Sequence, residues 1–164
     1  GTVGTSHLGM EMFKALSKTE VLHVPYKGSS GAVNDLISGQ VSGLFSSMPS
    51  LQGLVDKGYV RLVAATAPSR SPATRNLPLM SATLPGFEYS TWYAMYVPID
   101  TPQALVLRIN QALNQALRNP KLSDKVENAG TELHGGTIED VMRWTTRDTE
   151  KWSQLIQAAK ITVD

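Results

Sequence analysis

The chain has 164 residues, of which 41% are hydrophobic and 18% charged, and its formal net charge is +1. This is the composition of a globular protein with one domain or two small lobes. Its Lys and Arg residues are scattered rather than striped, so we expect no nucleic-acid partner. The chain has no cysteine, which excludes disulfides and cysteine nucleophiles. No apolar run is long enough to span a bilayer.

The first eight residues place small, donor-rich side chains directly before a helical pattern. They read Gly1-Thr2-Val3-Gly4-Thr5-Ser6-His7-Leu8, and the apolar positions of the helix are Leu8, Met12 and Leu16. The glycines allow close approach of a ligand, and Thr5 or Ser6 can cap the helix. N–H groups at the helix start would then face a carboxylate or phosphate. The octet is therefore compatible with an anion-binding turn and with a purely structural cap.

Short apolar segments alternate with helical patterns through the first half of the chain, as in an α/β layered fold. The predicted strands cover residues 21–24, 41–45 and 60–65. Helices are predicted over residues 29–39 and around residues 51–55. Each strand is followed by a turn with Pro, Ser or Gly, as in buried parallel strands whose carboxyl ends face a ligand.

The second half changes character after a proline-containing connection at residues 68–86, which predicts one helical turn near Met80. Residues 89–97 are rich in aromatic and β-forming side chains and predict a strand that crosses into a different packing unit. Three helices follow: one capped at Thr101-Pro102 with an apolar stripe to Leu117, one over residues 120–128 closed by Gly130, and a last one starting at Thr137 with Asp140 at its third position.

The sequence contains no clear motif for catalytic residues or for metal ligands. Ser6 beside His7 suggests a hydrolase, but adjacent side chains point in different directions, and neither Ser6 nor Ser46 lies in a nucleophile elbow. His7, His23 and His134 lack metal-ligand spacing, so we expect no metal site. We expect His7 at a cleft edge and His23 in the core. No phosphate-loop or dinucleotide fingerprint occurs, so we expect neither a cofactor nor an enzyme.

Several motifs occur together and in a recognisable order. The first are Gly1-Thr2-x-Gly4-Thr5-Ser6-x-Leu8, His23-Val24-Pro25-Tyr26-Lys27-Gly28 and Asp35-Leu36-x-x-Gly39-Gln40-Val41. They are followed by Gly58-Tyr59-Val60-Arg61-Leu62-Val63-Ala64, Leu84-Pro85-Gly86-Phe87-Glu88, Trp92 and Pro98-x-x-Thr101-Pro102. Spread over the whole chain, these motifs resemble the substrate-binding proteins of tripartite tricarboxylate transporters, known as the Bug family.

The resemblance implies an α/β fold of the type II periplasmic binding-protein class, with two lobes of mainly parallel sheet flanked by helices. Family members are roughly twice this length, so the resemblance implies a carboxyl-terminal half that lacks the N-terminal part of the first lobe. Residues 1–89 would form most of the second lobe, and residues 90–164 a crossing strand and helices that return to the first lobe. We expect their exposed apolar faces to depend on the missing segment, on an oligomer or on a segment swap.

The resemblance also implies a function, that of an extracytoplasmic receptor that delivers a small organic carboxylate to the membrane subunits of a transporter. It would reach the periplasm through a signal peptide absent from this chain. The opening turn would hold one ligand carboxylate, and the turns after the first two strands would line the same cleft. The expected ligand-binding residues are Gly1, Thr2, Val3, Gly4, Thr5, Ser6, His7, Tyr26, Lys27, Gly28, Ser46 and Ser47.

Some features leave alternatives open. Ser46 and Ser47 stand where relatives often carry an acidic or amide side chain, so the polarity of the ligand is open. Trp92 and Tyr93 could stack on a ligand, but aromatic residues in a crossing strand are more often part of the core, and we expect them there. Two alternative functions stay open. One is a ligand-sensing domain of a regulatory system, which would use the same lobes, and the other is a serine hydrolase.

Overall fold

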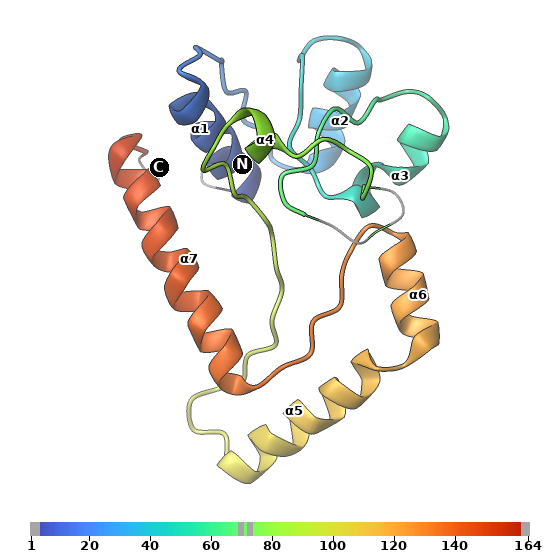
Figure 1. The fold of residues 1–164 in the computed structure, drawn as a ribbon, viewed down its shortest axis with the longest axis vertical. Helices are drawn as coiled ribbons and strands as arrows, with labels where there is room; N and C mark the ends of the chain where they lie inside the picture. The colour runs from blue at the N-terminus through green and yellow to red at the C-terminus, as the bar shows by residue number, and fades with distance from the viewer. Residues whose placement is uncertain (1–3, 69–70, 72–73, 162–164) are drawn as a thin grey trace.

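The structure is a computed structural model that describes residues 4–68, 71 and 74–161. Seven helices occur in this part of the chain: α1 (Thr5–Ser17), α2 (Ser29–Ile37), α3 (Met48–Asp56), α4 (Met80–Thr83), α5 (Gln103–Leu117), α6 (Pro120–Asn128) and α7 (Ile138–Ala158). Helices α1 to α4 gather at one end, and a long extended segment leads away from them toward α5 (Figure 1). Helix α7 returns and packs against α1. None of the described helices is both long and apolar enough to cross a membrane.

The last two helices begin where local sequence signals predict. At the start of α7, the Thr137 hydroxyl accepts a hydrogen bond from the Asp140 N–H at 3.2 Å, and the Asp140 carboxylate accepts one from the Thr137 N–H at 2.8 Å. This reciprocal pair is a capping box. Helix α6 begins at Pro120, and the Asn119 side chain accepts a hydrogen bond from the Lys121 N–H. The predicted helix starts are therefore confirmed for both elements, as is the helical turn near Met80.

Two other predicted caps are wrong. Gly4, rather than Thr5 or Ser6, is the N-cap of α1, and its carbonyl accepts hydrogen bonds from the N–H groups of His7 and Leu8 at 2.9 and 3.1 Å. Thr5 and Ser6 lie inside the first turn, where their backbone is already helical and their side chains cannot occupy the capping position. Similarly, Pro102 is the N-cap of α5 rather than its first residue.

The segments predicted as strands are extended but do not pair into a sheet within the described residues. In the part of the chain that the structure describes, the one β-bridge is an isolated parallel bridge between Ala65 and Leu79. Ala65 donates its N–H to the carbonyl of Pro78 and accepts from Met80, both at 2.9 Å. The predicted strands at 21–24, 41–45, 60–65 and 89–97 are therefore corrected to extended segments. Alternating apolar residues favour an extended backbone, but a ladder also requires a neighbouring strand, about 4.8 Å away.

The core forms around a short aromatic segment held between α1 and α7. Phe87 is 1% exposed and Tyr89 7% exposed, and both pack against Met12 of α1. The Tyr89 ring meets the Trp152 ring of α7 edge to face, with centroids 6.1 Å apart. Tyr89 also lies so close to Gly9 that a Cβ there would be 3.2 Å from its ring. Helix α1 can approach this segment because position 9 has no side chain.

The extended segment after the core presents apolar side chains to solvent. Tyr93 is 91% exposed and Ile99 96% exposed, and Met95 and Tyr96 are also exposed. The expected core position of Tyr93 is therefore wrong, because no described element covers that face. That another chain segment or a second copy covers it stays a prediction, as does the division into residues 1–89 and 90–164.

We predict that Phe87→Ala lowers the free energy of unfolding by about 3–5 kcal/mol, because it leaves a cavity in the aromatic core. Chemical unfolding followed by tryptophan fluorescence measures this change. Tyr93→Ala removes an aromatic ring of similar size from an exposed position, and its effect should stay within about 0.5 kcal/mol. Equal effects of the two substitutions would contradict the assigned core.

Candidate functional site

Three helices begin directly after extended segments, each at a cluster of predicted ligand-binding residues. Their N-caps are Gly4 for α1, Gly28 for α2 and Ser47 for α3, and none of these residues caps its helix with a side-chain hydrogen bond to a first-turn N–H group. The first-turn N–H groups carry the positive end of the helix dipole. Gly1, Thr2 and Val3 of the predicted site lie outside the described residues.

His7 occupies the third position of α1, inside the first turn. Its ring is stacked on that of His23, with centroids 4.0 Å apart and planes 6° from parallel. Its Nε2 atom lies 3.6 Å from the Glu11 carboxylate, and the side chains of His7 and Glu11 are each only 11% exposed. Glu11 in turn accepts hydrogen bonds from Lys14 at 2.8 and 3.1 Å. The α1 end of the site is thus a partly buried group of titratable side chains.

His23 differs from its expected place in the core, because it is only half-buried. Burial of the ring lowers its pKa below the ordinary value of 6.5, and positive charge on His7 lowers it further, whereas Glu11 acts in the opposite direction. The neutral imidazole is therefore the favoured form of His23 at neutral pH. Sequence spacing could not reveal the stack, since His7 and His23 lie on different elements.

Tyr26 is hydrogen-bonded to helix α2, which follows it in the chain. Its hydroxyl donates a 2.6 Å hydrogen bond to the Asp35 carboxylate of α2, and its ring lies against Gly31, where a Cβ would be 3.2 Å from the ring. The hydrogen bond to Asp35 raises the pKa of Tyr26 above 10.0. This contact fixes the turn that carries Lys27 and Gly28, both of which are exposed.

The third cluster is open to solvent. Ser46 and Ser47 are both exposed, and the Ser47 hydroxyl lies 3.0 Å from that of Ser50. The carbonyl of Ser47 accepts a hydrogen bond from the Ser50 N–H at 3.1 Å. These serines offer neutral donors and acceptors but no charge.

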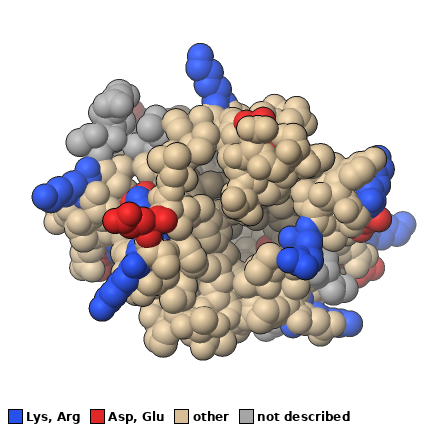
Figure 2. Space-filling model, turned by 90° about the horizontal axis from the view of Figure 1, so that it is seen from above, with Lys and Arg blue, Asp and Glu red and all other residues tan. Residues whose placement is uncertain are grey.

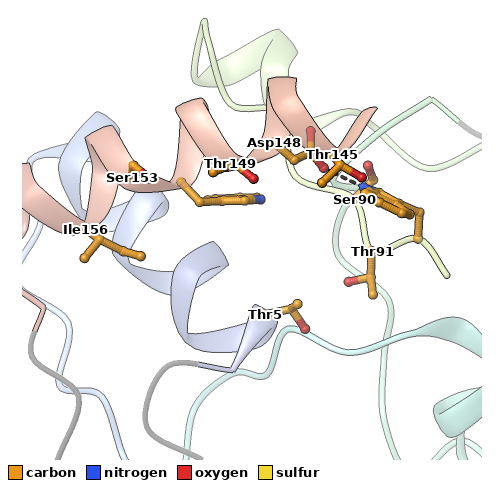
Figure 3. Close-up of a pocket in the computed structure, with 10 residues that line it drawn as sticks. Thr5, Ser90, Thr91, Thr145, Asp148, Thr149, Ser153 and Ile156 are labelled. Carbon is orange, nitrogen blue, oxygen red and sulfur yellow. Dashed lines mark hydrogen bonds between the residues drawn. The ribbon is translucent and has the colours of Figure 1, made fainter. Parts of the chain in front are cut away.

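A cavity of about 420 Å³ connects the start of α1 to the second half of the chain. It is lined by Thr5, by the segment Ser90-Thr91-Trp92 and by one face of α7, consisting of Thr145, Asp148, Thr149, Trp152, Ser153 and Ile156. Figure 3 shows Thr5 across the cavity from the α7 side chains. Hydroxyl groups and indole rings dominate this lining, so it can contact the hydrocarbon part of a ligand and offer hydrogen bonds to its polar atoms.

Trp92 is held in the cavity wall by a buried carboxylate. Its Nε1 donates a 2.6 Å hydrogen bond to Asp148, which is 8% exposed and also accepts a 2.9 Å bond from Arg147. Trp92 is thus half-buried, with its indole N–H satisfied and its side chain bordering the cavity. The sequence did not predict that α7 lines a site, although Asp148 and Trp152 lie four residues apart and so share a helix face.

The charge distribution is diffuse. On the face in Figure 2, Lys and Arg side chains stand apart from one another around a largely uncharged centre. Within the described part of the chain, no three His, Cys, Asp or Glu side chains are grouped so that they could hold a metal ion.

Comparison with known proteins gives one consistent family. Residues 1–161 match the model described as "Tripartite tricarboxylate transporter family receptor" (TctC). The chain is 35% identical over 157 residues to a UPF0065 protein from the tcbD–tcbE intergenic region of Pseudomonas sp. strain P51, a match that covers 94% of this chain and 47% of that protein. It is 33% identical to a UPF0065 protein from the clcB–clcD intergenic region of Pseudomonas knackmussii, with coverages of 94% and 93%.

Solved structures have the same fold. The Rpa4515 protein of R. palustris, solved with adipate, has a TM-score of 0.86 and 30% identity, covering 97% of this chain and 54% of that one. The periplasmic binding protein BugD has a TM-score of 0.81 and 27% identity, with coverages of 95% and 53%. The matches confirm the resemblance and the predicted fold class. The chain spans about half the length of these structures and of most of the curated relatives it matches.

We predict that one tyrosine titrates above pH 10.0 because of the Tyr26–Asp35 hydrogen bond. The difference in ultraviolet absorbance between the parent chain and Tyr26→Phe isolates this group, and Asp35→Asn should bring its pKa back toward 10.0. Because the pKa is raised in the folded state, the stabilisation is complete below pH 10.0 and is lost as pH rises through the folded-state value. Tyr93→Phe is the control, and a Tyr26 pKa that does not respond to Asp35→Asn would contradict the contact.

Proposed function

Because the chain belongs to the tripartite tricarboxylate transporter receptor family, we propose that it forms the carboxyl-terminal half of a periplasmic receptor for a small organic carboxylate. Members of this family are solute-binding receptors rather than enzymes. The proposal has three parts: a site for one ligand carboxylate, a set of contacts to the rest of the ligand, and delivery to the membrane subunits of a transporter.

The observation that carries the anion site is the uncapped start of α1. Gly4 occupies the N-cap and offers no side-chain acceptor, so the N–H groups of Thr5 and Ser6 are placed to donate to a ligand carboxylate. Thr5 also borders the cavity. A carboxylate bound at the helix start would therefore extend the remainder of the ligand into the space between α1 and α7.

The Tyr26 turn and the serines at 46 and 47 supply the other proposed contacts. The hydrogen bond to Asp35 holds the Tyr26 turn at the start of α2, and Lys27 adds a positive charge that attracts an anion over longer distances. Ser46 and Ser47 offer hydroxyl groups to a second polar group on the ligand. Such a site suits a dicarboxylate, and the adipate in the Rpa4515 structure makes adipate the first ligand to test.

Transport would follow from closure of the receptor around this ligand. In a two-lobed receptor, contacts from both lobes favour the closed form, and the membrane subunits distinguish that form by differential affinity. We propose that the protein delivers its ligand to the membrane subunits of a tripartite tricarboxylate transporter in this way.

We predict that adipate raises the thermal stability of the full-length protein and that Gly4→Val removes this effect. The N-cap backbone of Gly4 has φ −75° and ψ 163°, which valine can adopt, so the substitution places a side chain at the helix start without requiring a strained backbone. At about 100 times the dissociation constant, adipate should stabilise the parent protein by about 2.7 kcal/mol, measured by a thermal-shift titration.

The matched control is Gly53→Val, which places the same side chain on an exposed face of α3 with no atom within 4 Å of the new Cβ. This variant should keep the full adipate response. Absence of stabilisation by adipate and by other organic acids would refute the receptor assignment, and an undiminished response of Gly4→Val would refute the α1 site.

A further inference from the structure

We propose that His23 belongs to the binding site as the partner of His7, and that the stacked pair takes up a proton when a carboxylate binds at the start of α1. This inference rests on the proposed function. It adds to the site a residue that the motif order did not assign, and it makes the affinity for the ligand dependent on pH.

The first argument is geometric. His7 is the third residue of α1, so its backbone belongs to the same helical turn as the N–H groups proposed to bind the carboxylate. His23 comes from the extended segment before the Tyr26 turn, and its ring covers that of His7 at a centroid distance of 4.0 Å. The two imidazoles therefore connect the α1 start with the segment that carries the second group of proposed ligand contacts.

The second argument is electrostatic. Two stacked imidazolium ions would repel each other strongly at this separation, so double protonation of the pair is disfavoured. Among the described residues, the charged groups that act on His23 besides His7 include Glu11 and Lys14, both on α1. Glu11 favours a proton on His23, whereas burial of the ring, positive charge on His7 and the Lys14 ammonium disfavour it.

A bound carboxylate changes this balance. It adds a negative charge beside the pair, which favours the protonated imidazole. By linkage, a proton on the pair must strengthen carboxylate binding to the same degree that the carboxylate strengthens proton binding. Affinity should therefore increase as pH falls from about 8 to about 6, by at most about tenfold per pH unit for one proton. The carboxyl groups of adipate remain mostly ionised over this range.

The test is calorimetric titration of the full-length protein with adipate at about pH 6, 7 and 8. Each titration is repeated in buffers that differ in ionisation enthalpy, so that the number of protons taken up per ligand is measured directly. We expect severalfold tighter binding at the lowest pH and a net proton uptake between zero and one. His7→Gln and His23→Gln should each reduce both effects.

His134→Gln is the matched control. This histidine is exposed, lies on the connection before α7 and pairs with Glu132 rather than with the α1 group. It should leave the pH dependence and the proton uptake of the parent protein unchanged. If His134→Gln abolished the proton uptake, the proton would belong to another part of the molecule and the inference would be wrong.

A second measurement needs no substitution, so it holds even if a variant fails to fold. Nuclear magnetic resonance titration of the imidazole signals should show that the apparent pKa of the pair rises when adipate is bound. Adipate binding with pH-independent affinity and unchanged imidazole titration would overturn the inference and leave the receptor function intact. Failure of any organic acid to bind at any pH would overturn both.

Discussion

The packing of Phe87 and Tyr89 between α1 and α7 is the contact on which the rest of the arrangement depends. These two rings are among the most buried side chains of the described chain, and they join helices that are more than a hundred residues apart in sequence. Gly9 lets α1 approach the Tyr89 ring, and Trp152 covers that ring from α7. Together with the direct packing of α7 on α1, this contact holds the two helices in position.

The same packing determines what lies beside the start of α1. Because α7 is held against α1, its polar face and the segment Ser90-Thr91-Trp92 form the wall opposite Thr5. The Asp148 hydrogen bond keeps the Trp92 ring in that wall. The first turn of α1 thus combines backbone donors with a neighbouring cavity, and His7 of the stacked histidine pair belongs to the same helical turn as those donors. These features together suit a site that binds an anion without transforming it.

The sequence was most informative where structure is local. The Thr137–Asp140 box and the Asn119-Pro120 start predicted α7 and α6 because a cap requires only residues a few positions apart. The predicted strands were wrong, because the pairing of strands depends on which segments lie side by side. The alternation of apolar residues along one segment does not specify this. The exposed Tyr93 and the α7 wall were missed for the same reason, since burial and cavity lining depend on which elements meet. Family membership, in contrast, could be predicted from the order of short motifs, and the family match over residues 1–161 confirms it.

The most direct test of the account is a crystal structure of the full-length protein with adipate. The account predicts one adipate carboxylate at the start of α1, with its oxygens about 2.7–3.2 Å from first-turn backbone nitrogen atoms, and the chain of the ligand directed toward Thr5 and Trp92. Adipate bound elsewhere, with the first turn of α1 contacting only solvent, would contradict it.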